Sequence, residues 1–324
     1  MRRWRGLDHL PGSWGRCVVT IGVFDGVHRG HQALIGRAVA LAGERGLPSV
    51  VLTFDPHPAE VVRPGSHPAQ LTSLSRKSEL VEELGVDVFC VLPFTLELSR
   101  LPADEFVHEL LVKQLHVAAV VVGENFSFGY HAAGNVELLR ALGNRFGFIT
   151  EGATMVKVPR DGAPADAEMV FSSTYIRSCI DAGDVAAAAA ALGRPHRLEG
   201  IVVRGDGRGR ELGYPTANLS TARHAAVPAD GVYACWFVHR GPTTHEERRF
   251  AAAVSVGTNP TFSGRERRVE AFVLDLDEDL YGQRVALDFV ARLRDQERYD
   301  TVEALVDQVG LDVRHTRDLL AIAD

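Results

Sequence analysis

The chain has 324 residues, more than an average single domain, so its length predicts two domains. A hydrophobic content of 46% and a charged content of 24% are typical of a globular protein with a sizeable core. The formal net charge of −7, without a basic stripe interleaved with aromatic residues, argues against a dedicated nucleic-acid-binding protein. No apolar run is long enough to span a membrane. From the charge and the apolar runs together, we expect neither nucleic acid nor a membrane as a partner.

Four cysteines are widely spaced along the chain and form no Cys-x-x-Cys pair; they are Cys17, Cys90, Cys179 and Cys235. Each lies in an apolar stretch, which predicts buried, reduced thiols rather than a redox pair. The basic start MRRWRGLDHLPG is not followed by the apolar segment of a signal peptide. The sequence therefore predicts a cytoplasmic protein.

Up to about residue 190, apolar segments alternate with amphipathic helical patterns. The apolar segments are continuous, as is typical of strands buried on both faces of a parallel sheet. We predict strands over 17–24, 49–54, 86–92 and 117–123, and helices near 31–45, 74–84 and 103–114. This alternation predicts a Rossmann-like α/β domain with a doubly wound parallel sheet.

The stretch DVAAAAAALG, at 184–193, contains six consecutive alanines and has a high helix propensity. It predicts a helix that joins two domains and ends around Gly193–Pro195. We therefore place the first domain at 1–186 and the second at 187–324.

After Pro195 the pattern changes to short segments rich in Val, Phe and Tyr, separated by turn residues. They are RLEGIVVRG (197–205), GVYACWFV (231–238), RFAAAVSVG (249–257), RRVEAFVLD (267–275) and QRVALDFVARL (283–293). This pattern predicts a small antiparallel β-barrel. A final helical pattern over 301–323 predicts a helix that closes the chain.

Two histidines, His28 and His31, follow the first predicted strand in TIGVFDGVHRGHQALI (20–35). Glycines at 22, 26 and 30 allow the backbone between strand and helix to approach a ligand closely. A helix start offers free N–H groups and the positive end of the helix dipole, both of which suit a phosphate group.

Three interpretations of this histidine pair compete: a zinc site, a structural pair and a phosphate site. Zinc would need further ligands, for which His57 is a candidate, but no cysteine or ligand cluster supports it. The order strand, Gly-x-Phe-Asp-Gly-x-His-x-Gly-His, helix favours phosphate, because imidazoles can donate hydrogen bonds to its oxygens. This string resembles the signature of the nucleotidyltransferase superfamily, in which two histidines contact the triphosphate of ATP.

Two later stretches fit the same site. GENFSFG (123–129) follows the fourth predicted strand at its carboxyl end, where ligands bind in such sheets. SSTYIR (172–177) places hydroxyls and an arginine at the start of a helix, as a triphosphate contact requires. Taken alone, Ser172 to Thr174 is more often an ordinary helix N-cap.

The second domain carries its own glycine-rich stretch, GDGRGRELGYPTANL (205–219). Such a loop alone is usually a flexible turn, but this one leads into Thr216 and Asn218. Residues two apart lie on one face of a strand, so their oxygens can hold Mg²⁺ against nucleotide phosphates. Glu270, in an otherwise apolar predicted strand, is either a general base or an edge or ion-pair residue.

Taken together, these segments resemble the bifunctional bacterial riboflavin kinase and FAD synthetase family, in the right order from Thr20 to about Val309. The resemblance implies two ATP-dependent reactions. Riboflavin is phosphorylated to FMN with release of ADP, and FMN is adenylylated to FAD with release of pyrophosphate.

The resemblance also implies residue roles, with Glu270, His28 and His31 as catalytic residues. It implies ATP contacts at Gly22, Phe24, Asp25, Gly26, Ser173, Thr174, Arg177, Gly205, Gly207, Arg208, Gly209, Arg210, Pro215 and Asn259. It implies flavin contacts at Phe54, Pro56, Pro58, Asn125 and Arg294, and Mg²⁺ ligands at Thr216 and Asn218.

Three rival functions remain open at this point. One is an adenylyltransferase or cytidylyltransferase for a nicotinamide nucleotide or a pantetheine phosphate, against which the barrel with GYPTAN argues. The others are a non-enzymatic flavin-binding protein and a chain with one inactive domain. Turnover with ATP and Mg²⁺ separates these possibilities.

Overall fold

The computed structural model describes residues 1–7, 14–153, 157–159, 168–205, 209, 212–240, 247–261 and 264–321. Contacts between residues divide the chain into two compact units. The first contains residues 1–68 and 74–172, and the second contains residues 69–73 and 173–324.

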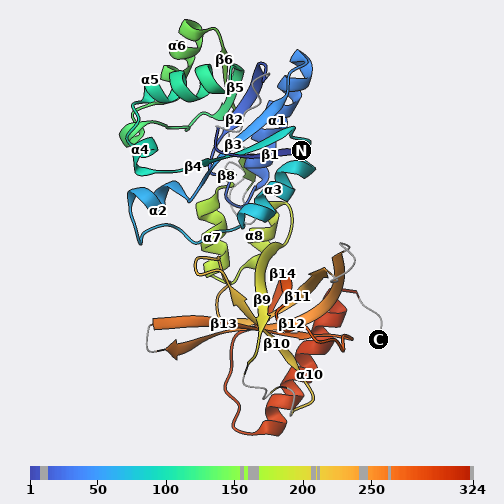
Figure 1. Cartoon of the computed structure of the whole chain (residues 1–324). Helices are drawn as coiled ribbons and strands as arrows, with labels where there is room; N and C mark the ends of the chain where they lie inside the picture. Colours follow the sequence, from blue (N-terminus) through green and yellow to red (C-terminus); the bar gives the residue numbers. More distant parts are fainter. Residues whose placement is uncertain are drawn as a thin grey trace. The chain divides into compact units, whose positions relative to one another are not determined.

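The first unit is built on a six-stranded parallel sheet with the order β1-β4-β3-β2-β5-β6 (Figure 1). Its strands are β1 Arg2–Arg5, β2 Cys17–Ile21, β3 Ser49–Asp55, β4 Val88–Pro93, β5 Val117–Gly123 and β6 Ile149–Ala153. The predicted parallel sheet is thus confirmed, and the structure adds β1 and β6, one at each edge.

Helices cover both faces of this sheet. They are α1 Arg29–Arg45, α2 Pro58–Val62, α3 Leu74–Glu83, α4 Leu96–Ser99, α5 Ala103–Glu105, the π-helix Phe106–Gln114, a 3₁₀ turn Tyr130–Ala132 and α6 Val136–Phe146. Apolar residues of α1 and α3 pack on one face, and those of the π-helix and α6 pack on the other. A short antiparallel pair, β7 Lys157–Pro159 and β8 Glu168–Val170, precedes the second unit.

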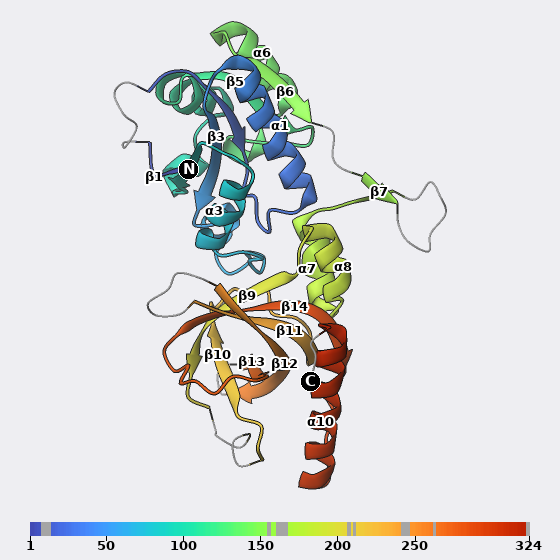
Figure 2. The same cartoon turned by 90° about the vertical axis from the view of Figure 1, so that its right-hand side faces the viewer.

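The second unit is a closed antiparallel barrel with the order β10-β13-β12-β11-β14-β9. Its strands are β9 His196–Val203, β10 Thr216–Thr221, β11 Gly231–Arg240, β12 Glu247–Thr261, β13 Gly264–Val273 and β14 Arg284–Arg294. Helix α10, Val302–Leu319, lies alongside the barrel (Figure 2). The predicted barrel and closing helix are confirmed.

Two helices, α7 Ser173–Asp181 and α8 Val185–Leu192, group with the barrel rather than with the parallel sheet. Helix α8 is the predicted alanine-rich helix, and Gly193 ends it in the left-handed conformation with φ of 76°. Val185 is buried in the barrel core. The division into compact units therefore falls at 172/173, whereas our boundary at 186/187 between independently folding domains stays a prediction.

Residues 69–73 belong to the second unit because of specific contacts with barrel residues. Gln70 pairs in parallel with Ala225, and the Ser73 hydroxyl donates a hydrogen bond to Glu199 at 2.5 Å. The four cysteines are free and buried, as predicted, and burial raises the pKa of the Cys17 and Cys90 thiols to about 12.

Candidate active sites

Three predicted site segments meet at the carboxyl edge of the parallel sheet. Residues 22–28 follow β2, residues 54–58 end or follow β3, and Asn125 follows β5. Because β2 lies between β3 and β5, the three segments emerge side by side. This edge is where doubly wound sheets bind their ligands.

The segment 22–28, which we call the histidine loop, has an unusual backbone. Phe24 and Val27 have φ of 51° and 39°, in the left-handed region that side-chain-bearing residues rarely adopt. Such conformations persist only where surrounding contacts enforce them. Gln32 Nε2 donates to the Val27 carbonyl at 2.9 Å, and Thr53 Oγ1 donates to the Val23 carbonyl at 3.1 Å.

His28 caps the amino end of α1 with its side chain. Its Nδ1 accepts a hydrogen bond from the backbone N–H of His31 at 3.3 Å. An Nδ1 that accepts carries a lone pair, so the ring proton of the neutral imidazole lies on Nε2, which is then a donor. The cap therefore sets the tautomer that a phosphate oxygen needs.

His31 stacks on His28, with ring centroids 3.6 Å apart and planes inclined by 23°. Burial lowers the pKa of His31 well below 6.5, and His28 and Lys77 lower it further. Its Nδ1 atom is buried and makes no hydrogen bond with any residue in the described ranges. The pair is thus a neutral, partly unsatisfied group at the start of a helix, which fits an anion better than a structural role.

The zinc interpretation finds no support within the part of the chain that the structure describes. No group of three or more His, Cys, Asp or Glu residues that could hold a metal ion is present there. His57 caps α2 instead, because its Nδ1 accepts from the Ala59 N–H at 3.1 Å.

Two glycines of the histidine motif have close neighbours. A Cβ on Gly22 would lie 3.0 Å from the Phe24 ring, and one on Gly30 would lie 3.1 Å from the His28 ring. The same Cβ on Gly30 would lie 3.5 Å from the Phe171 carbonyl, so the segment that leads into α7 passes beside the start of α1.

The predicted flavin contacts of the first unit lie at the same sheet edge. Phe54 is half-buried and packs edge-on against Phe94, with centroids 5.5 Å apart. The Asp55–Pro56 peptide bond is cis, and Pro58 is the first residue of α2. Asn125 is exposed.

The remaining ATP contacts predicted for this site open α7, in the second unit. They are Ser173, Thr174 and Arg177. The Arg177 Nε donates to the Ala69 carbonyl at 2.6 Å. The structure therefore groups these three residues with residues 69–73 rather than with the histidine loop.

In the barrel, strand register places the predicted kinase residues together. Asn218 on β10 lies directly opposite Glu270 on β13, and Ser255 on β12 lies opposite Glu270 on the other side. The residues that alternate with them, including Val269 and Ala271, point into the core. Glu270 and Asn218 therefore share the outer face of the barrel with Thr216, two residues before Asn218.

The Glu270 side chain is 32% exposed, and the Nη1 of Arg268 lies 3.6 Å from its Oε1. That separation exceeds a hydrogen bond, so the ion pair leaves the carboxylate able to accept a proton. A Cβ on Gly205 would overlap the Asn218 amide, and one on Gly209 would overlap the Tyr214 carbonyl. The glycine-rich loop thus lies against the predicted Mg²⁺ ligands.

Several predicted residues cannot be placed. Gly207, Arg208 and Arg210 lie outside the described residues. The backbone of Asn259 belongs to β12, but its side chain lies outside the described part.

A pocket of about 630 Å³ is lined by Thr216 together with core-facing residues such as Val202 and Ala271; Asn218 and Glu270 do not line it. Pro215, Leu276 and Tyr281 also contribute to its lining. The predicted flavin contact Arg294 does not line this pocket. It holds the buried Asp312 of α10 through two nitrogens, with Nη2 at 2.7 Å and Nε at 2.9 Å, so its guanidinium ties α10 to the barrel.

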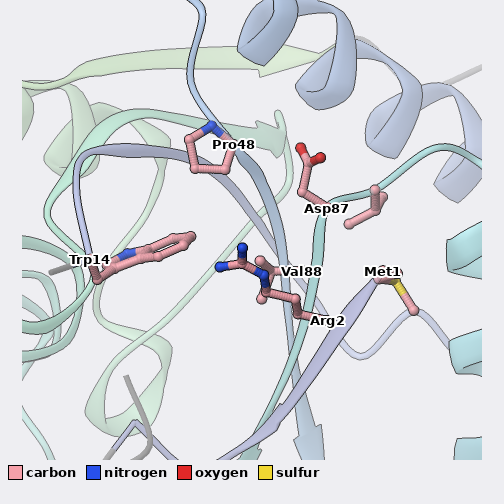
Figure 3. A pocket seen from close by; sticks show the side chains of 7 residues that line it. Met1, Arg2, Trp14, Pro48, Asp87 and Val88 are labelled. Atoms are coloured by element: carbon pink, nitrogen blue, oxygen red, sulfur yellow. The ribbon is translucent and has the colours of Figure 1, made fainter. Parts of the chain in front are cut away.

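A second pocket, of about 520 Å³, lies at the opposite, amino-end edge of the parallel sheet (Figure 3). Arg2, Trp14, Pro48 and Asp87 line it, where β1, β3 and β4 begin. It contains none of the predicted site residues.

Sequence reasoning missed Lys77, which is 6% exposed and whose Nζ donates to the Val23 carbonyl of the histidine loop at 2.7 Å. A signal was present in the sequence. Leu74, Lys77, Ser78 and Val81 have the spacing of one helix face, so Lys77 stands on the apolar stripe of α3.

The fold and the two sites define a two-domain nucleotide-dependent transferase. Its first domain is a doubly wound parallel sheet with a histidine loop at the carboxyl edge, and its second is a barrel with an Asn–Glu face. Comparison with known families narrows this class. The model of the FAD synthetase family matches residues 11–162, and that of the riboflavin kinase family matches residues 192–320.

Curated relatives match the whole chain. A bifunctional riboflavin kinase/FMN adenylyltransferase of Pseudomonas fluorescens is 37% identical over 99% of this chain and 98% of its own length. The protein of that name in Escherichia coli K12 is 34% identical, with 99% of both chains covered. This chain belongs to the bifunctional riboflavin kinase/FMN adenylyltransferase family.

A crystal structure of a Streptococcus pneumoniae protein described as a macrolide-efflux protein has the same two-domain fold. It superposes with a TM-score of 0.85 and 31% identity, over 98% of this chain and 99% of its own. Among the helices in the described ranges, none has the length and apolar character needed to cross a membrane.

Proposed function

We propose that this bifunctional enzyme makes FMN in the barrel and FAD at the histidine loop, through two sites that share no catalytic residue. The observation that carries the proposal is that one chain holds both a neutral histidine pair at a helix start and a carboxylate opposite an amide on a barrel face. The first arrangement suits a nucleophile that is already ionised, and the second suits a hydroxyl that must lose a proton.

At the histidine loop, the nucleophile is the phosphate of FMN, which attacks the α-phosphorus of ATP and displaces pyrophosphate. An ionised phosphate needs no general base, so positioning and charge stabilisation carry the reaction. The Nε2–H of His28 and the neutral His31 ring serve as donors to the phosphates, whereas triphosphate contacts at Ser173, Thr174 and Arg177 stay a prediction of the family resemblance. Phe54, Pro56, Pro58 and Asn125 are the proposed flavin neighbours.

In the barrel, Glu270 accepts the proton of the 5′-hydroxyl of riboflavin while that oxygen attacks the γ-phosphorus of ATP. Thr216 and Asn218 fit a Mg²⁺ site, because both offer neutral oxygens on the outer face beside Glu270. Mg²⁺ typically takes one or two protein ligands and completes its shell with phosphates and water, and when bound it offsets phosphate charge. The glycine-rich loop at 205–210 holds the phosphates, and the pocket beside Pro215 accommodates the nucleoside.

The proposed substrates are riboflavin, FMN and ATP, and the products are FMN, FAD, ADP and pyrophosphate. Arg294 is not a flavin contact in this proposal, because its guanidinium is hydrogen-bonded to Asp312. Its role is to attach α10 to the barrel. A cytoplasmic location remains a prediction of the sequence.

Turnover of the purified chain tests this proposal. Riboflavin is incubated with ATP and Mg²⁺, and the flavins are separated by chromatography; we expect FMN first and then FAD. Removal of Mg²⁺ with a chelator should stop FMN formation. Flavin binding without turnover would instead indicate a binding protein, and a single product would indicate one inactive domain.

A further inference from the structure

Lys77 of α3 is a buried lysine directly beneath the histidine loop. It is 6% exposed, and its Nζ donates to the Val23 carbonyl at 2.7 Å. Taking an ammonium group out of water costs several kcal/mol. Replacing a buried charged group by an apolar side chain of similar volume often leaves the protein as stable as before, or more stable. A buried lysine is therefore poorly explained by packing alone.

Lys77 donates a hydrogen bond to the Val23 carbonyl, and the orientation of this carbonyl fixes the direction of the N–H group of Phe24. In a planar trans peptide the C=O and N–H bonds point in opposite directions. Because Lys77 and Thr53 both donate to the Val23 carbonyl, the Phe24 N–H points away from α3. Phe24 itself has φ of 51°, and its N–H makes no hydrogen bond to the described residues.

Lys77 also contributes a positive charge at this place. Burial lowers the pKa of Lys77, whereas the nearby carboxylates Asp25 and Asp55 raise it and so favour the charged form. After burial and His28, the same charge contributes to the lowered pKa of His31. A cation below the loop complements a triphosphate bound above it.

We propose that Lys77 is a positioning residue for adenylyl transfer: it aims the Phe24 N–H at the phosphates of ATP and places a cation beneath the histidine loop. The proposal rests on the assignment of adenylyl transfer to the histidine loop. Helix α3 carries none of the residues implied by the family resemblance. The proposed role of Lys77 gives this helix a defined part in the reaction.

The test replaces Lys77 by Met in the full chain and compares it with Thr53→Val. Both variants remove one donor from the Val23 carbonyl, but only Lys77→Met also removes the charge. We expect kcat for FAD formation from FMN to fall about 10- to 100-fold in Lys77→Met, below the effect of deleting a direct oxyanion donor. Thr53→Val should lose at most about 3-fold, since Lys77 still holds the carbonyl.

Three readouts separate positioning from a purely structural role. The KM for FMN should stay within about 2-fold, because the flavin neighbours are untouched. The melting temperature of Lys77→Met should be unchanged or higher, since a buried cation is replaced by an apolar group. Riboflavin phosphorylation by the same preparation should be unchanged, as should both reactions in the matched surface variant Lys113→Met.

Wild-type kcat in a folded Lys77→Met variant would overturn the proposal, as would equal losses in Lys77→Met and Thr53→Val. Should Lys77→Met fail to fold, Lys77→Gln replaces it, with the same expectation for kcat; if neither variant folds, Lys77 is a folding residue and the proposal falls. Failure of the wild-type chain to form FAD would instead contradict the assignment of adenylyl transfer.

Discussion

The histidine loop of the parallel-sheet unit is one unbroken stretch of chain, whereas the Glu270 face of the barrel is assembled from three strands. Residues 22–31 bring the loop backbone, the helix start and both imidazoles together locally. Asn218, Glu270 and Ser255 are far apart in the sequence and become neighbours only through antiparallel register. The first site therefore depends on local backbone conformation, and the second depends on the pairing of whole strands.

The two sites also differ in charge. The histidine pair is neutral, because burial, His28 and Lys77 lower the pKa of His31 and because the Nδ1 of His28 accepts a hydrogen bond. The barrel site presents a carboxylate that is 32% exposed. This difference matches the two proposed nucleophiles, an ionised phosphate and a neutral hydroxyl, and it implies that each site can be inactivated alone.

The largest effect is expected from Glu270→Gln. The substitution keeps the size of the side chain but removes its ability to accept a proton, so FMN synthesis should fall by about 10² to 10⁴. FAD synthesis from supplied FMN should be almost unchanged. Initial rates and the melting temperature are measured on one preparation.

The alternative role of Glu270, an ion pair with Arg268, gives a different pattern. Glu270→Gln would then lower the melting temperature while kinase turnover at low temperature stayed near wild type. Arg268→Gln is the matched control, since it breaks the ion pair and leaves the carboxylate in place.

Replacing both His28 and His31 by Ala makes the converse test. FAD formation should fall by about 10²-fold or more, because preorganised donors act where charge develops in the transition state. Riboflavin phosphorylation should remain nearly intact, and chromatography of the flavins resolves both activities. Equal loss of the two activities would refute the two-site proposal.

A third prediction concerns the domain boundary, through fragments 173–324 and 187–324. Both should phosphorylate riboflavin at low temperature. The shorter fragment lacks the buried Val185 and the Asp184 cap of α8, so its free energy of unfolding should be lower by about 2–4 kcal/mol. Thermal unfolding compares them; equal stability would support the boundary at 186/187 over that at 172/173.

The sequence predicted the central strands because their apolar runs are continuous. It predicted the barrel because its short apolar segments are separated by turn residues. It missed β1, which is the polar edge strand RRWR and has no apolar run, and β6, ITEGA, for the same reason. Within the sites, contiguous motifs were readable. The helical spacing signalled that Lys77 is buried, but the partners of Lys77 and of Arg294 could not be predicted, because each is acquired only in the tertiary structure.

A smaller effect is expected from two glycines of the same helix, α1. A Cβ on Gly36 has nothing within 4 Å, so Gly36→Ala should stabilise the unit by about 1 kcal/mol without changing either activity. A Cβ on Gly30 would press on the His28 ring at 3.1 Å, so Gly30→Ala should lower FAD formation by roughly 3- to 10-fold, since misplaced groups lose catalytic alignment. Identical kinetics in the two variants would show that the position of His28 is not critical.

The smallest effect is the contribution of His31 to the pH dependence of stability. Its pKa in the folded chain lies well below the 6.5 of an ordinary histidine, mainly through burial. Between this lowered pKa and about 6.5, the unfolded chain binds a proton that the folded chain does not. The contribution of His31 to stability is therefore fully present above about pH 6.5 and is lost as the pH falls through the lowered pKa. His31→Asn cannot take up this proton, so melting temperatures measured between about pH 7 and pH 5 should fall less steeply in the variant. Parallel curves would mean that His31 binds protons equally in both states, and the neutral histidine pair would then lose its physical basis.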